Sequence, residues 1–533
     1  MIKRYFYITI ILILTSFSAS AQFYVTGDDP GKLKWSYIES EHFRIIYPRG
    51  TDSLAKAYGI DLERYRTPLS RTSGYLGSGG FGKKMPVVLH THNGANGSVA
   101  WAPKRMDMFT LPSAYDPEPI PWSRMLSIHE GRHVTQMQFG MTKALKPGNY
   151  IFGEMWNIAA TLLFPGIVFM EGDAVIAETA YTPSGRGRTA DFLNYYRIAC
   201  ENGFYRKWDQ WHFASQKNYS PTYYALGYLG IGGIRYLYDM PDIMNKGFEL
   251  SARRPYNLAA FYTTIKKETG LNLDKVFKEV CDTMTVMWKK DSEFRAPFIP
   301  SEPVTKNPKL YTEYNNGIFI GNDLYAVKKG HLTAPVLVKI DPLLKETVIS
   351  RFSSETSALK YDNDGNIYWS EEKPDPRWSL KTVSSIQKLD NNKRHSHKIG
   401  KKGFVYNPAM SPDNDKIALT EYLVQGTSAI QIRVNDKKSE ILETYPAPDS
   451  LQLVESVWMT DEFIYSTAVS NNGYGIYRLN LNSGLWETIL SPQPVMMKDF
   501  EGYDGMLIFT CDRTGVNELY HLNPTTKELF QKT

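Results

Sequence analysis

The part of the chain beyond about Lys309 repeats one short pattern of polar turns and alternating strands. Turns rich in Asn, Asp and Gly alternate with apolar strands in the segments 315–330, 362–374, 410–422, 459–484 and 501–530. Alternation of apolar and polar residues is the period of a strand with one buried face. The pattern recurs about every 40 to 50 residues, which predicts an all-β propeller of about five blades. No closing strand is evident after the last repeat, so an incomplete propeller or a β-sandwich also fits.

The chain before this repeat has two zones of different texture. From Phe23 to about Glu118 the pattern is mixed, with a helix expected between the first two of three strands, at 42–48, 85–92 and 106–111. From Trp122 to about Trp288 helical spacing of apolar residues dominates. Helices are expected over 121–140, 164–179, 191–201, 223–238, 257–269 and 273–289.

The N-terminus carries the features of a secretory signal peptide. Lys3 and Arg4 precede an apolar run from about Tyr5 to Phe17, and small residues at 19–21 permit cleavage before Gln22. An uncleaved anchor is the alternative, although the run is short for a bilayer span. No Cys follows the cleavage point, which disfavours a lipid anchor there. We expect a periplasmic or secreted bacterial protein with no transmembrane span in the mature chain.

Composition narrows the classes of partner. The net charge of +5 arises from 61 basic and 56 acidic residues, without a basic block interleaved with aromatics, so nucleic-acid binding is disfavoured. The most basic stretch, 391–402, is expected to be a solvated loop. Three cysteines lie far apart, so the fold does not depend on a disulfide framework, although Cys200 and Cys281 could pair.

The segment Ser123 to Gly140 contains the motif H-E-x-x-H, from His129 to His133. Residues four apart on a helix share a face, so both imidazoles can reach a single ion. Glu130 points about 100° away from His129 and is poorly placed as a ligand, but it can accept a proton from a metal-bound water. Two core histidines on an apolar stripe with Leu126 and Met137 are the alternative.

A catalytic zinc needs a third protein ligand and an open position. Glu171 is the candidate, on a helix expected to begin near Pro165. Glu178 shares its face two turns further on and is expected to support a ligand histidine. Ala174 and Ala177 are small enough to let another helix approach closely. Solvent-exposed glutamates are the alternative, but the apolar run "GIVFM" before Glu171 favours burial.

The motif H-E-x-x-H followed by P-x-x-x-x-x-E-G-x-A-x-x-x-E resembles the gluzincins, the aminopeptidase- and thermolysin-related zinc peptidases. It is similar in particular to the bacterial peptidase MA-like proteins, which carry a TolB-like propeller behind the catalytic domain. The segment "NPAMSPDNDKIAL", 407–419, resembles the blade element of such propellers. The catalytic resemblance spans about 122–238. Gly131 within the helix, and an aromatic displaced to Phe169, depart from the family pattern.

The resemblance implies an α+β zincin-like metallopeptidase domain followed by an all-β propeller, with Zn²⁺ as cofactor. His129, His133 and Glu171 would bind the zinc, Glu130 would be the general base, and Glu178 would support a ligand. The implied organisation is a signal peptide at 1–21, an N-terminal α/β part with a substrate-binding edge strand at 22–118, a helical zinc-binding part at 119–295, a linker at 296–310 and a TolB-like propeller at 311–533.

Two further roles follow from the resemblance alone. Gluzincins commonly use a Tyr or His to stabilise the oxyanion, and spacing favours Tyr224 over Tyr219, Tyr223 and Tyr228, with simple packing as the alternative. An edge strand beside the motif helix pairs with the substrate main chain in the family. The segment 93–112 is the candidate, with Asn96 and Gly97 at the point of close approach. His90 and His92 share a strand face without an acid partner, which disfavours them as metal ligands.

The sequence therefore predicts an exported zinc-dependent metallopeptidase that hydrolyses peptide bonds by Glu-assisted attack of a zinc-bound water. Its propeller would filter, dock or recruit a peptide or protein substrate, and it offers a surface for a protein partner. The alternative is a catalytically inactive, peptidase-like periplasmic binding or scaffold protein that acts through its propeller. A hydrolase of non-peptide amides or esters uses the same ligands and also stays open. The sequence does not distinguish exopeptidase from endopeptidase action.

Overall fold

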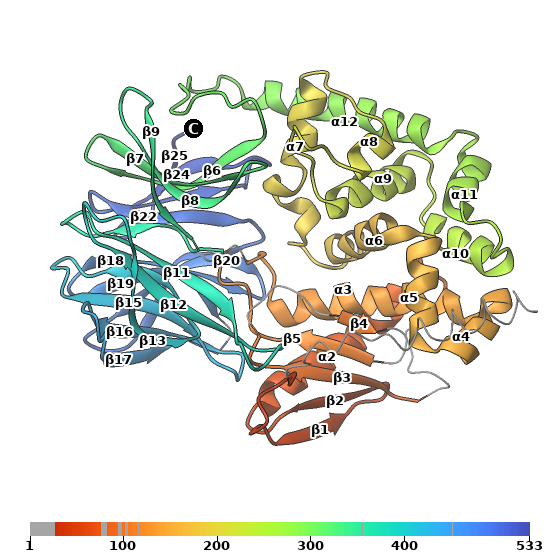
Figure 1. Ribbon diagram of the computed structural model, residues 1–533, viewed down its shortest axis with the longest axis horizontal. Helices are drawn as coiled ribbons and strands as arrows, with labels where there is room; N and C mark the ends of the chain where they lie inside the picture. Colours follow the sequence, from red (N-terminus) through yellow and green to blue (C-terminus); the bar gives the residue numbers. More distant parts are fainter. Residues whose placement is uncertain are drawn as a thin grey trace, which may run out of the picture.

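The chain is divided between a mixed α/β part and a set of five separate antiparallel sheets (Figure 1). The computed structural model describes residues 27–75, 83–93, 99–101, 105–115, 117–352, 355–449 and 451–533. The expected signal peptide, residues 1–21, lies outside the described residues.

The N-terminal sheet has five strands in the order β1-β2-β3-β5-β4. Its strands are β1 (Trp35–Glu39), β2 (Phe43–Pro48), β3 (Met85–His90), β4 (Val99–Trp101) and β5 (Arg105–Phe109). The three central strands β2, β3 and β5 are parallel, and β1 and β4 are antiparallel edge strands. The three strands expected from the sequence therefore form the parallel centre, and the short strand β4 follows the turn proposed to contact substrate.

Helices cover this sheet and build the rest of the α/β part (Figure 1). They are α2 (Asp52–Ser70), α3 (Trp122–Met137), α4 (Lys146–Phe152), α5 (Glu154–Leu163), α6 (Gly166–Tyr181), α7 (Ala190–Glu201), α8 (Trp208–His212), α9 (Tyr223–Leu237), α10 (Ile243–Arg253), α11 (Ala260–Thr269) and α12 (Leu273–Arg295). The sequence analysis missed α4, α5, α8 and α10. Pro147 and Gly148 suggest a loop, but Pro147 lies in the first turn of α4, where its missing N–H costs no helical hydrogen bond.

The motif helix α3 packs directly on the sheet. Apolar side chains of the sheet strands and of α2 form one buried cluster with Leu126 and Val134 of α3. Gly131 lies where α3 meets α2, and a Cβ at this position would be 2.8 Å from Leu69 Cδ1. Gly131 has a low helix propensity, but its missing side chain permits the close contact between α3 and α2.

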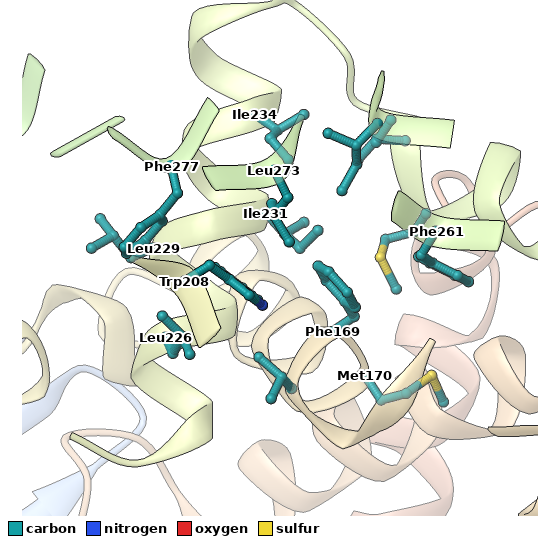
Figure 2. Close-up of a cluster of buried hydrophobic side chains, with 14 of the residues drawn as sticks. Phe169, Met170, Trp208, Leu226, Leu229, Ile231, Ile234, Phe261, Leu273 and Phe277 are labelled. Carbon is teal, nitrogen blue, oxygen red and sulfur yellow. The ribbon is translucent and has the colours of Figure 1, made fainter. Parts of the chain in front are cut away.

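A second core surrounds α6 and α9 (Figure 2). Phe169 of α6 stacks on Trp208 with ring centroids 5.4 Å apart. Positions two residues apart on a helix differ by about 200°, so Glu171 points to nearly the opposite side of α6. The aromatic that departs from the family pattern thus fixes the rotation of α6 about its axis.

Helices α6 and α9 meet at two glycines. A Cβ at Gly172 would lie 2.1 Å from the carbonyl carbon of Gly227, and one at Gly227 would lie 1.9 Å from the Val168 oxygen. Of the two alanines expected to let another helix approach, Ala177 packs against residues of α2 and α3. Only residues without a side chain allow the backbones to come this near.

The C-terminal part is a five-bladed β-propeller, and each blade is a four-stranded antiparallel sheet. Helix α12 ends at Arg295 and the first blade begins at Thr312. The blades are β6 (Thr312–Ile320), β7 (Asp323–Gly330), β8 (Thr333–Ile340) and β9 (Glu346–Arg351); β10 (Lys360–Tyr361), β11 (Ile367–Pro374), β12 (Thr382–Leu389) and β13 (His397–Gly403); β14 (Val405–Met410), β15 (Lys416–Tyr422), β16 (Ser428–Val434) and β17 (Ile441–Pro446); β18 (Gln452–Thr460), β19 (Phe463–Ser470), β20 (Gly473–Asn480) and β21 (Trp486–Gln493); and β22 (Met497–Tyr503), β23 (Met506–Cys511), β24 (Glu518–Leu522) and β25 (Leu529–Gln531).

The propeller predicted from the repeat is therefore confirmed, and the β-sandwich alternative is wrong. Strand β25 completes the fifth blade. The blade element 407–419 forms β14, a turn and β15, and Asn414 in the turn has a φ of 65°, a conformation that asparagine tolerates. The basic stretch 391–402 is only partly a loop, because β13 begins at His397 and pairs with β12.

The segment between β5 and α3 reaches into the propeller. A cavity of about 500 Å³ is lined by residues of the first, third, fourth and fifth blades, by residues 355, 356 and 358 ahead of β10, and by residues 113–115 and Pro117. Asn407 donates a hydrogen bond to the Ala114 oxygen (2.9 Å), and the Tyr474 hydroxyl donates one to the Pro117 oxygen (2.7 Å). The connection that leads into the motif helix is thus held by the propeller.

Among the described helices, none has both the length and the apolar composition to cross a bilayer alone. The segment Met155–Leu163 of α5 meets those criteria only jointly with α6, and these two segments are bent by 94° relative to each other.

Candidate metal centre

The structure brings His129, His133 and Glu171 together. The two imidazoles come from α3 and the carboxylate from α6, and the two Nε2 atoms are 3.1 Å apart. Glu171 Oε2 lies 3.0 Å from His129 Nε2 and 3.1 Å from His133 Nε2. Within the described ranges, this is the group of His, Cys, Asp or Glu residues whose ligand atoms converge closely enough to hold one cation.

The geometry and chemistry of this group fit zinc. A tetrahedral zinc with ligands at about 2.0–2.2 Å holds neighbouring ligand atoms about 3.4 Å apart. The three distances of 3.0–3.1 Å are close to that value. Two imidazoles and one carboxylate are also a ligand set typical of catalytic zinc.

Each imidazole is held from its far side by a second polar residue. Glu178 Oε1 lies 2.5 Å from His129 Nδ1, and Gln136 Oε1 lies 2.8 Å from His133 Nδ1. Both contacts use Nδ1 and so direct the Nε2 atoms towards Glu171. Glu178 occupies the position expected from the sequence. Gln136 was missed, although its place three residues after His133 on the same helix was a usable signal.

Glu178 is itself fixed by Arg186, a residue that the sequence analysis did not single out. The Arg186 guanidinium donates from Nη2 to Glu178 Oε1 (2.5 Å) and from Nε to Oε2 (2.9 Å). Glu178 is completely buried. Against the effect of burial, Arg186 lowers the pKa of Glu178 to about 2, so this carboxylate is an acceptor throughout the ordinary pH range.

A second buried ionic group joins the helices that carry the centre. Asp173 of α6 accepts hydrogen bonds from Arg132 Nε (2.7 Å), Gln136 Nε2 (2.6 Å) and Arg235 Nη2 (2.6 Å). Against burial, the two arginines lower the pKa of Asp173 to about 2. Because its partners come from α3 and α9, Asp173 ties both helices to α6 next to the candidate ligands.

Protons and a cation compete for the same imidazole nitrogens. Burial lowers the pKa of a histidine, but hydrogen bonds to Glu171 and Glu178 outweigh it and raise the pKa of His129 to about 10. Against burial, the two imidazoles hold the pKa of Glu171 well below its usual value. Cation binding requires neutral imidazoles, so it must release these protons and weaken as the pH falls.

Glu130 lies between the two histidines on α3 and is 5% exposed. It does not belong to the three converging ligand residues. Burial lowers the pKa of His133, but Glu171 raises it by a larger amount, and the charge of Glu130 adds a smaller increase. Glu130 is therefore a buried carboxylate whose charge acts on His133.

Tyr224 is the tyrosine of the expected set whose ring lies against the cluster. Its ring centroid is 6.2 Å from that of His129, and the Arg186 guanidinium lies 5.3 Å from its centre. Burial is the main cause that raises the pKa of its hydroxyl well above the usual value, so it stays protonated and can donate.

The other three tyrosines pack elsewhere or behind Tyr224. Tyr223 stacks on Tyr224, with ring centroids 4.8 Å apart. Tyr219 packs between Tyr195 and Tyr311. Tyr228 donates to the Gly187 oxygen at 3.5 Å.

The remaining candidates of the sequence analysis lie outside this centre. Asn96 and Gly97 are outside the described residues, and β4, two positions later, is the antiparallel edge strand next to β5. The expectation that His90 has no acid partner is wrong. His90 Nδ1 lies 2.8 Å from Asp29 Oδ2 and Nε2 lies 3.1 Å from Asp107 Oδ1, because the fold brings both carboxylates to the end of β3. These residues bind one another instead of converging on a cation.

The cysteines are all free thiols. Cys200 on α7 and Cys281 on α12 interact with each other, and this hydrogen bond and burial raise the pKa of Cys281 well above its usual value. The pairing that the sequence left open is thus a thiol contact in this structure.

Comparison with known proteins gives matches among solved structures alone. No protein-family model matches the chain, and no curated protein matches it. A TolB structure of Agrobacterium tumefaciens is 15% identical with a TM-score of 0.28, covering 36% of this chain and 65% of that one. TolB of Acinetobacter baumannii is 12% identical with a TM-score of 0.31, over 37% of this chain and 49% of that one.

A prolyl endopeptidase structure is similar at the same low level. It is 8% identical with a TM-score of 0.29, covering 41% of this chain and 36% of that one. The chain spans less than two thirds of the length of each of these three structures. At such TM-scores the similarity supports no conclusion about activity, and the five blades rest on the strand pairing itself.

Proposed function

We propose that the protein is an exported, zinc-dependent peptidase. The observation that carries the proposal is the convergence of His129, His133 and Glu171, with Glu178 and Gln136 holding the outer nitrogens of the two imidazoles. Two core histidines would need neither a shared carboxylate nor matched partners at both Nδ1 atoms. Zinc in this place would supply Lewis-acid activation of water and of the substrate carbonyl.

Residues of the chain itself would supply the proton acceptor, the oxyanion donor and the substrate-binding strand of such a peptidase. Glu130 accepts the proton of the attacking water at its carboxylate and passes it to the leaving amine. The Tyr224 hydroxyl, kept protonated by its raised pKa, donates to the developing oxyanion. Strand β4 is an edge strand beside α3, and such an edge can pair with the main chain of an extended peptide. The propeller holds the segment leading into α3 and restricts or recruits substrates on that side.

Metal analysis combined with a peptide-library digest tests this proposal. We expect about one zinc per chain in the protein, loss of zinc in His133→Ala and Glu171→Ala, and cleavage that a chelator abolishes and zinc restores. Zinc at stoichiometry without cleavage of any peptide would favour the inactive binding or scaffold protein. A protein that cleaves esters or non-peptide amides alone would keep the metal centre and change the substrate class.

A further inference from the structure

Helices α4 and α5 expose a dense group of large apolar side chains. They lie at the end of the α/β part away from the propeller (Figure 1). Each is between 53% and 72% exposed, and together they are called here the α4–α5 patch: Tyr150, Ile151, Phe152, Met155, Leu162 and Leu163. Contiguous apolar surface of this kind marks an interaction site more often than scattered exposed residues do.

The two helices form one surface because α4 folds back on α5. Trp156 of α5 lies against Gly148 of α4, where a Cβ would be 2.2 Å from the indole, and its ring stacks with Phe152 at 6.2 Å. On α5, Met155 and Leu162 are seven residues apart and share the outward face. Ala160 on the other side is buried in the core around α6. Helix α5 therefore has a buried inward face and an apolar outward face, and α4, none of whose residues is buried, contacts it through Gly148.

Charged residues near the patch are few. Between Thr142 and Met170 the sequence carries only Lys143, Lys146 and Glu154 as charged residues. The Lys146 ammonium lies 5.7 Å from the centre of the Tyr150 ring, an arrangement in which the stem covers apolar surface while the charge stays at its margin. Apolar tips bordered by tyrosine and lysine are typical of helices that lie in a membrane interface.

The exposed apolar residues of α12 lack this pattern. Val286, Met287 and Phe294 on α12 are also exposed, but charged residues at 289–291 and 293 alternate with them. Such interleaved charges keep a helix surface in water. The α4–α5 patch differs from α12 because few charged residues lie among its exposed apolar side chains.

We propose that the α4–α5 patch docks the protein on the surface of an anionic lipid bilayer. The helices have seven and ten residues, and α6, which continues from α5, is packed into the protein core, so the patch lies in the headgroup region and does not cross the bilayer. Lys146 favours anionic headgroups, whereas the Lys143 ammonium forms an ion pair with Glu249. Docking there would hold the α/β part against the lipid, with the propeller at the opposite end (Figure 1).

Vesicle flotation of the full mature chain tests this proposal. We expect the protein to float with vesicles of phosphatidylglycerol and phosphatidylethanolamine, and less with phosphatidylcholine alone. The double variant Ile151→Glu, Phe152→Glu should lower the bound fraction at least tenfold, because both side chains are exposed and the charges oppose insertion. Lys146→Glu should weaken binding to anionic vesicles only.

The matched control is the double variant Leu332→Glu, Leu343→Glu. Both leucines are more than 80% exposed and lie on the propeller, so flotation should be unchanged. Unchanged circular dichroism and melting temperature of the patch variant establish that it is folded. Failure of the folded wild-type protein to float, or equal flotation of the patch variant, would overturn the proposal. So would a lipid-free dimer that the patch variant converts to a monomer, since the patch would then cover a second copy.

Discussion

Glu178 Oε1 lies 2.5 Å from His129 Nδ1, on the side of the imidazole opposite to the nitrogen that faces Glu171. The same carboxylate oxygen accepts from Arg186, and the side chain is completely buried. A buried carboxylate in this position orients the ring, fixes its tautomer and raises its basicity as a ligand. In the proposed zinc site, Glu178 would act through His129 without belonging to the ligand set.

The variant Glu178→Gln should bind zinc about 10- to 100-fold more weakly than the wild-type protein. The amide keeps the size of the side chain but removes the charge that polarises His129 and pairs with Arg186. Competition with a chromophoric chelator at fixed pH measures the affinity. Glu130→Gln is the matched control and should keep its affinity within about two-fold. Equal affinity of Glu178→Gln and the wild-type protein would show that Glu178 has no positioning role.

The variant Glu130→Gln should keep the metal and lose peptide cleavage. General-base catalysis typically contributes about 10²- to 10⁴-fold to the rate, and glutamine cannot accept the proton. The measurement is kcat/KM on a substrate found in the library digest, together with zinc content of the same preparation. Cleavage at near the wild-type rate would rule out Glu130 as the base.

The pairs of residues within one helix could be predicted from the sequence. Helical spacing alone places His129 and His133 on one face of α3, and Glu171 and Glu178 on one face of α6. The blades could be predicted for the same reason, since each is a local repeat of turns and strands. Spacing also identified most of the longer helices. It missed α4, which contains Pro147 and Gly148, and α5.

The contacts between elements could not be predicted. Asp173 meets Arg132 and Arg235 across three helices, and Arg186 reaches Glu178 from a turn after α6. No periodicity marks such pairs, because they depend on how separate helices pack. The same holds for Ala114 and Pro117, whose backbone oxygens bind blade residues far along the chain.

The crossing of α6 and α9 gives a prediction on stability. Gly172→Ala introduces a Cβ that would lie 2.1 Å from the backbone of Gly227, next to the candidate ligand Glu171. The helices must separate, at a cost of about 1–3 kcal/mol or more, and zinc affinity should fall with the displaced Glu171. Gly232→Ala on the partner helix α9 is the control, because its Cβ has only an ordinary contact 3.9 Å away. It should be neutral or stabilising by up to about 1 kcal/mol. Equal melting temperatures for the two variants would contradict the close crossing.

His90 gives a prediction on pH. Burial lowers the pKa of His90, but hydrogen bonds to Asp107 and Asp29 outweigh this effect and raise the pKa to about 9 from a usual value of 6.5. The folded state therefore holds this proton more tightly than the unfolded state, so its stabilisation is complete below about pH 6.5 and is lost as the pH rises through about 9. The difference corresponds to at most about 3 kcal/mol. The melting temperature of the wild-type protein should fall between pH 6.5 and 9, and that of His90→Gln should start lower and fall less. His331→Gln, on the exposed propeller surface, should follow the wild-type profile. A His90→Gln profile parallel to the wild-type one would mean that the protonated imidazole does not tie Asp29, and the N-terminal segment it belongs to, to the sheet.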